Sequence, residues 1–160
     1  MLMEWEVALR LVAGMAAGMV IGLDRARLGK GTGVRTLGLV GLGTAAATAI
    51  FDATGHEDAA SRVVQGIVTG IGFLGAGVIV RRSGETFPRG LTTAASVWVT
   101  AALGSAAGAG VWTVVGTGGV LAFLLLAVGP RIERLFGPGD ADDGAGENDR
   151  RDDVRDTPPH

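Results

Sequence analysis

The residues best suited to chemistry stand where charge meets apolar sequence, in the stretch "IGLDRARLGKGTGVRT". Asp24 and Arg25 follow one apolar run, and Arg35 and Thr36 begin the next. If these runs cross a membrane, a carboxylate at their edge is costly unless it is paired, and an arginine is its natural partner. The stretch predicts either an ion pair that sets the topology at the interface, or a site where Asp24 contributes to cation binding or partner contact.

A second group of polar side chains opens another apolar run, in "GLTTAASVW". Thr92, Thr93 and Ser96 fall within its first turns, where their hydroxyls cap the helix or bond to a neighbouring helix. Ser96 has no evident base, neither histidine lies in an apolar run, and the chain has no cysteine. Nucleophilic catalysis therefore lacks its usual groups. We therefore expect that the protein is not an enzyme and uses no cofactor.

Metal binding has two weak candidates in the sequence. His56 stands with Asp52, Glu57 and Asp58 in one acidic loop, which is either a weak divalent-cation site or simply solvated. The acidic residues near the C-terminus are unspaced, which favours a solubilising role over chelation. No metal site is therefore assigned.

Long apolar segments must position these groups. Of the 160 residues 48% are hydrophobic, and no charged residue occurs between Gly90 and Pro130. At 1.5 Å per residue these roughly 40 residues would form about 60 Å of helix, twice a hydrocarbon core of about 30 Å, so they must cross twice. The reversal is expected within "GSAAGAG", residues 104–110. The pattern predicts an all-α polytopic membrane protein, a five-helix transmembrane bundle with spans at about residues 7–23, 36–51, 63–80, 91–107 and 111–129.

The basic residues fall mainly on one side of these spans. The loops after the first, third and fifth spans are rich in arginine, whereas the opposite side carries mostly acidic residues. By the positive-inside rule, the N-terminus is outside and the C-terminus is cytoplasmic. Residues 1–136 form the transmembrane domain. Residues 137–160, with eight acidic residues and three arginines, are predicted to be a disordered acidic cytoplasmic tail.

Small residues recur at fourfold spacing in three spans, which favours close helix packing in a bilayer or contact between copies of the chain. On a helical layout, residues 63–80 keep one bulky stripe for lipid, Ile67, Ile71, Leu74 and Val78, and are otherwise largely cleared of bulk. We therefore expect this span at the centre of the bundle. The residues expected to pack are Gly14, Gly18, Gly22, Gly66, Gly70, Gly72, Phe73, Gly75, Gly77, Gly104 and Gly108.

Three ordered blocks, "GMVIGLDRARLGKGTGVRTLGLVGLGTA", "RVVQGIVTGIGFLGAGVIV" and "GLTTAASVWVTAALGSAAGAG", resemble the membrane domain of the MgtC/SapB family of bacterial inner-membrane proteins. The resemblance runs from about Ala13 to Trp112 and implies a five-helix membrane domain. Two positions depart from the family pattern, with Asp24 where Glu is usual and Leu37 where His is frequent. Some members continue into a cytoplasmic ACT-like domain. Here only the acidic tail follows, so regulation by such a domain is not expected.

The resemblance implies a role in adaptation to magnesium limitation and, in pathogens, in survival inside macrophages. The implied mode is contact with other inner-membrane proteins, proposed to include the membrane sector of the ATP synthase, and homo-oligomers are a further option. The alternative is a transporter or channel for Mg²⁺ or another cation. It is less favoured because cation pathways usually place acids at membrane depth, and the second to fifth spans contain no Asp or Glu. The lipid bilayer is the remaining partner, and no nucleic acid is expected.

Overall fold

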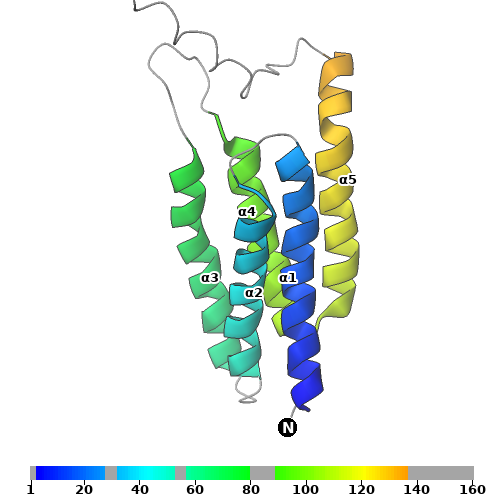
Figure 1. Cartoon of the computed structure of the whole chain (residues 1–160). Coiled ribbons are helices and arrows are strands. Elements are labelled where there is room, and N and C mark those ends of the chain that lie inside the picture. The colour runs from blue at the N-terminus through cyan, green and yellow to red at the C-terminus, as the bar shows by residue number, and fades with distance from the viewer. Residues whose placement is uncertain (1–2, 28–31, 53–56, 80–88, 137–160) are drawn as a thin grey trace, which may run out of the picture.

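The chain folds as a bundle of α-helices (Figure 1) in a computed structural model that describes residues 3–27, 32–52, 57–79 and 89–136. Successive helices run in opposite directions, so the first, third and fifth are parallel to one another. The predicted all-α class is confirmed. In chain order the helices are α1 Glu4–Arg27, α2 Val34–Asp52, α3 Glu57–Val78, α4 Leu91–Gly108 and α5 Trp112–Phe136.

Four of these helices, α1, α2, α3 and α5, are long and apolar enough to cross a membrane. The remaining helix, α4, has 18 residues and carries hydroxyl side chains on its buried face, among them Ser96, Thr100 and Ser105. Such side chains are expected where a helix is surrounded by other helices rather than by lipid. The bundle is that of a multi-pass membrane protein.

Helix α4 is the centre of the bundle. It contacts all four other helices, and ten of its 18 residues are buried. Helix α3 contacts α2 and α4, α5 contacts α1 and α4, and the two lie on opposite sides of the inner group α1, α2 and α4 (Figure 1). The prediction that residues 63–80 form the centre is therefore wrong.

Part of the α3 stripe that was expected to face lipid points into the bundle instead. Ile71 is buried in the apolar core with Val97 and Ala101 of α4, and Ile67 packs beside it. Ile67 and Ile71 of the stripe expected to face lipid thus hold α3 against its neighbours, whereas Leu74 of the same stripe is 49% exposed. Phe73, on the other side, is 83% exposed.

The glycines of α3 point mostly away from the bundle. A Cβ added to the backbone at Gly75 would lie 3.7 Å from the Cβ of Ala94, an ordinary contact. At four other positions an added Cβ would meet no atom of the described chain within 4 Å. These are Gly66, Gly70, Gly72 and Gly77, so their predicted packing role is not fulfilled inside this chain.

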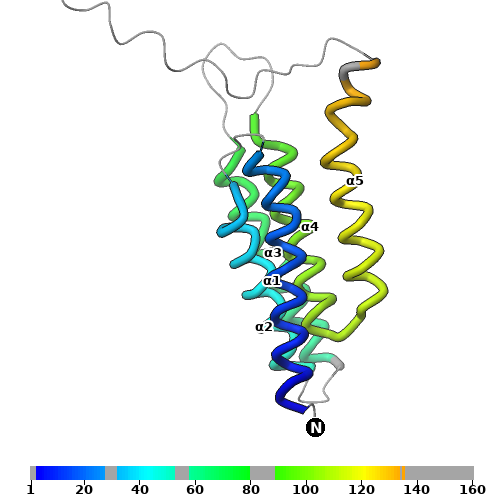
Figure 2. The backbone as a smooth tube through the Cα atoms, turned by 45° about the vertical axis from the view of Figure 1, so that its right-hand side comes forward, coloured from blue at the N-terminus to red at the C-terminus, as the bar shows by residue number. Residues whose placement is uncertain are grey.

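The chain reverses between α4 and α5 within the region expected for the turn. Helix α4 ends at Gly108, and Gly110 follows with a φ of 73°, a left-handed conformation that glycine adopts without steric cost. The guanidinium of Arg10 lies against it, since an added Cβ at Gly110 would be 2.8 Å from Nη2. Helix α5 then runs past Pro130 to Phe136, and it leans away from the other helices towards its C-terminal end (Figure 2).

Candidate functional site at the ends of the bundle

One end of the bundle is marked by a buried arginine, Arg25, in the last turn of α1. Its side chain is only 4% exposed, and its Nη2 donates a hydrogen bond to Oγ1 of Thr93 on α4. The contact arises because α1 ends where the antiparallel α4 begins. A buried guanidinium requires hydrogen-bond acceptors. The structure thus brings together two groups that the sequence placed in separate motifs.

The acid beside it, Asp24, is half-buried. Its Oδ2 atom is buried and accepts no hydrogen bond from the described residues. Arg35 and Thr36, in the first turn of α2, are exposed. The expected pairing of Asp24 with Arg25 or Arg35 stays a prediction. Among the four candidates Asp24, Arg25, Arg35 and Thr36, Arg25 is the one that is buried.

The hydroxyl of Ser96 at this end is satisfied within α4. Ser96 is buried and donates to the carbonyl oxygen of Thr92 at 2.7 Å, one turn earlier. The side chain of Thr92 is exposed. Ser96 therefore packs as a small residue with an internally bonded hydroxyl, and Thr93 is the hydroxyl that links two helices.

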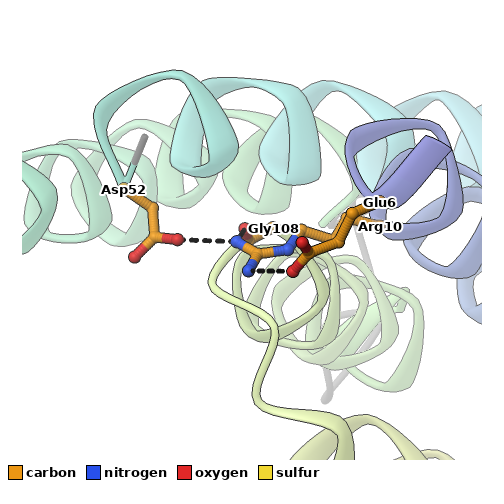
Figure 3. Close-up of polar contacts among 4 residues, drawn as sticks. All are labelled: Glu6, Arg10, Asp52 and Gly108. Atoms are coloured by element: carbon orange, nitrogen blue, oxygen red, sulfur yellow. Dashed lines mark hydrogen bonds and ion pairs between the residues drawn. The ribbon is translucent and has the colours of Figure 1, made fainter. Parts of the chain in front are cut away.

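The opposite end is held by Arg10, which is 6% exposed (Figure 3). Its Nη1 donates to Oδ2 of Asp52 at 2.6 Å and to the carbonyl oxygen of Gly108 at 2.8 Å. Its Nη2 donates to Oε1 of Glu6 at 2.9 Å. One guanidinium thereby joins the start of α1, the end of α2 and the end of α4. Charge-assisted hydrogen bonds of this kind are stronger than neutral ones.

Sequence reasoning missed most of this cluster. Glu6 and Arg10 are four residues apart on a helix, which predicts their pairing. Asp52 was expected in an acidic loop, whereas it is the last residue of α2. A usable signal was present, because Arg10 is a lone charge inside an apolar run and Asp52 ends the antiparallel run that follows.

Between the two ends, glycines bring the inner helices into backbone contact. A Cβ added at Gly14 would lie 2.6 Å from the Cβ of Ala45 and 2.8 Å from the carbonyl oxygen of Gly41. Added at Gly22, it would lie 2.6 Å from the Cα of Val34. Real Cβ atoms essentially never approach so closely, so these α1 positions exclude any side chain.

The same close contact continues at Gly18 of α1 and at two glycines of α4. A Cβ at Gly18 would collide with the backbone of Leu37, one at Gly104 with the hydroxyl of Thr44, and one at Gly108 with the carbonyl oxygen of Ala45. The Thr44 hydroxyl itself donates to the carbonyl oxygen of Val40 at 2.9 Å. The inner group of helices is consequently closed along its length by van der Waals contact of main chains.

The loop and tail candidates for metal binding cannot be placed, since His56 and residues 137–160 lie outside the described residues. Within the described ranges, no group of three or more His, Cys, Asp or Glu side chains is arranged to hold a metal ion. The sites that the structure does define are the Arg10 and Arg25 clusters.

Fold and site together define a polytopic helical membrane protein whose inner helices are closed by glycine contacts and anchored by one buried arginine at each end. Residues 11–135 match the model of the MgtC family. The chain belongs to the MgtC family, as the resemblance to MgtC/SapB proteins predicted.

Three similar proteins illustrate the range of the family. Protein SrpB of Synechococcus elongatus is 40% identical over 145 residues, covering 82% of this chain and 80% of its own. The protein named "Putative magnesium transporter YhiD" of Escherichia coli is 38% identical, over 79% of this chain and 61% of its own length. Protein MgtC of Salmonella typhimurium is 42% identical, over 64% of this chain and 43% of its own. No solved structure matches the chain.

Proposed function

We propose that this chain is a non-enzymatic regulator in the bacterial inner membrane, which acts in adaptation to magnesium limitation through helix contacts with other membrane proteins. Membership of the MgtC family supports a membrane protein linked to magnesium, and one relative carries a name that describes a magnesium transporter. The chain spans less than half of the Salmonella MgtC protein, so the proposal concerns what the membrane domain does.

The proposal rests on the large part of the α5 surface that its own chain leaves exposed. No residue in its apolar span, Trp112–Glu133, is buried, and the helix leans away from the bundle (Figure 2). Helices in a bilayer associate through close packing rather than hydrophobic burial. A span with so little packing in its own chain keeps its surface for a helix of another protein.

The open face of α5 carries one glycine followed by two branched residues. Gly116, Val120 and Leu124 follow one another at fourfold spacing and are exposed. A Cβ added at Gly116 would meet no described atom within 4 Å. A foreign helix can therefore approach the backbone there, with the branched side chains filling the space beyond.

Affinity capture with matched variants tests the proposal. The tagged full chain is captured from membranes of cells grown in low Mg²⁺, and the co-purifying proteins are identified. Gly116→Leu on α5 is compared with Gly43→Leu on α2, where an added Cβ also meets nothing within 4 Å, so that neither change disturbs the bundle.

We expect one inner-membrane protein, for which the membrane sector of the ATP synthase is a candidate, to co-purify with the unchanged chain and with Gly43→Leu but not with Gly116→Leu. Capture of copies of the chain alone would overturn the proposal. So would an identical set of proteins with all three forms.

Cation transport is the second candidate function. It is favoured by buried polar atoms that lack a hydrogen-bond partner among the described residues, the hydroxyls of Thr48, Thr100 and Ser105 and Oδ2 of Asp24. Against it stands the backbone contact at Gly14, Gly18 and Gly104, which leaves no width for an ion between the inner helices. We expect purified protein in liposomes to move Mg²⁺ no faster than empty liposomes. A flux that Asp24→Asn and Asp24→Ala abolish, with insertion intact, would place the chain in the transporter class instead.

A further inference from the structure

The outward face of α3 carries more than small residues. At about 100° per residue, Asp58, Arg62, Gln65, Thr69 and Phe73 fall on the half of the helix opposite the buried Ile71. All five are exposed in the structure. The face therefore runs from a charged end, through two polar residues, to an aromatic ring.

Lipid is a poor environment for the middle of this face. Gln65 lies eight residues into α3, roughly 12 Å along the helix axis from its start. Hydrocarbon supplies no hydrogen-bond partner to a side-chain amide, and leaving one unpaired is costly. The neighbouring hydroxyl is already satisfied, since Thr69 Oγ1 donates to the carbonyl oxygen of Gln65 at 2.9 Å. The Gln65 amide is thus the group to which a second helix would supply a hydrogen-bond partner.

The chemistry of the face matches a second copy of itself. Two copies inserted with the same orientation meet with α3 parallel to α3, related by a two-fold axis along the membrane normal. In such a pair identical residues lie at the same height, and the long Arg62 side chain, which points towards the N-terminus of its helix, reaches back one turn to the oppositely charged Asp58 of the second copy. An amide carries both a donor and an acceptor, which lets Gln65 pair with an identical Gln65.

Space for the contact is present on the same face. A Cβ added at Gly66, Gly70 or Gly77 would meet no described atom within 4 Å, so these positions are open to a helix from outside. We propose that two copies of the chain associate through this face of α3, with Asp58 and Arg62 paired across the interface and the Gln65 amides hydrogen-bonded to each other. The proposal goes beyond the proposed function and is independent of it, because the contact with other proteins was assigned to α5.

Disulfide trapping tests the association in the full chain, which has no native cysteine. Phe73→Cys is placed in the proposed interface, and Leu125→Cys on the exposed surface of α5 serves as the matched control for random collision. Under mild oxidation of native membranes, we expect a dimer yield from Phe73→Cys several-fold above that from Leu125→Cys. Equal yields would overturn the proposal, including the case in which a different protein occupies this face.

A charge exchange tests the paired ends, with Phe73→Cys as the reporter. Asp58→Arg alone and Arg62→Asp alone should each lower the dimer yield about fivefold, because each loses two symmetry-related ion pairs. The double exchange should restore the yield, since opposite charges again face each other. Gly70→Leu should lower it and Gly43→Leu should not. A double exchange as weak as the single changes would overturn the proposed pairing.

Discussion

Arg10 of α1 and Asp52 of α2 form a salt bridge of 2.6 Å between Nη1 and Oδ2, although they are 42 residues apart in the sequence. The same nitrogen donates to the carbonyl oxygen of Gly108 on α4. Because the guanidinium is buried, each partner offsets part of the cost of removing its charge from water. This relationship predicts unequal effects when its two acids are removed.

Asp52→Ala should destabilise the protein more than Glu6→Ala. Removing Asp52 leaves a buried donor of Arg10 short of an acceptor and removes one link between α1 and α2, at a cost of about 1–3 kcal/mol. Glu6 pairs with Arg10 within one helix, where such pairs contribute about 0.5 kcal/mol. Unfolding of the purified protein in detergent micelles measures both. Equal losses would contradict the assignment of Asp52 as the link between helices.

Two glycine-to-alanine changes should have opposite effects on stability. In Gly18→Ala the new methyl group meets the backbone of Leu37, which cannot move as a side chain does, so we expect a loss on the order of 3 kcal/mol. Gly66→Ala meets nothing within 4 Å and should gain up to about 1 kcal/mol from helix propensity. Unfolding of both purified variants in detergent micelles measures these changes in stability. A neutral Gly18→Ala would show that the inner helices are not in backbone contact.

Neighbouring threonines at the start of α4 should respond differently to loss of the hydroxyl. Thr93→Val removes an acceptor from the buried Arg25 and should cost about 1–3 kcal/mol. Thr92→Val changes an exposed side chain and should stay within about 0.5 kcal/mol. Thr93→Ser, which keeps the hydroxyl, is the control and should recover most of the loss. Similar values for both valine variants would rule out a stabilising role for the Arg25 hydrogen bond.

The orientation predicted by the positive-inside rule is testable with single cysteines. Asp58 and Arg35 are exposed near opposite ends of the bundle, and the chain has no other cysteine to react. With the N-terminus outside, a membrane-impermeant maleimide added to intact cells should label Asp58→Cys. It should label Arg35→Cys only after the membrane is opened. The reverse pattern would invert the topology.

Much of the architecture could be predicted because a lipid bilayer restricts the choices. Hydrocarbon demands long apolar helices with internal hydrogen bonds, so apolar length and the charged breaks located the helices of the bundle. The reversal near Gly110 was predictable for a similar reason, since about 40 uncharged residues exceed one crossing. The pairing of Glu6 with Arg10 was local and followed from helical spacing alone.

What joins residues distant in sequence was decided by the fold. The hydrogen bond from Arg25 to Thr93 and the salt bridge from Arg10 to Asp52 each depend on which helix ends meet. The sequence motifs that contain Arg25 and Thr93 do not indicate that the end of α1 lies beside the start of α4. Antiparallel packing of the inner helices supplies that information.

The glycines of α1 and α3 show most clearly which contacts could not be predicted from the sequence. Both ladders are equally visible in the sequence, yet Gly14 and Gly18 contact other backbones whereas Gly66 and Gly70 face outwards. Lipid and the interior of a membrane protein are both apolar, so hydrophobicity does not reveal which face of a helix is inside. Apolar length and charged breaks were enough to predict how many helices form and roughly where they end. Close packing in three dimensions decided that Ile71 points inwards whereas Gly66 and Gly70 face outwards.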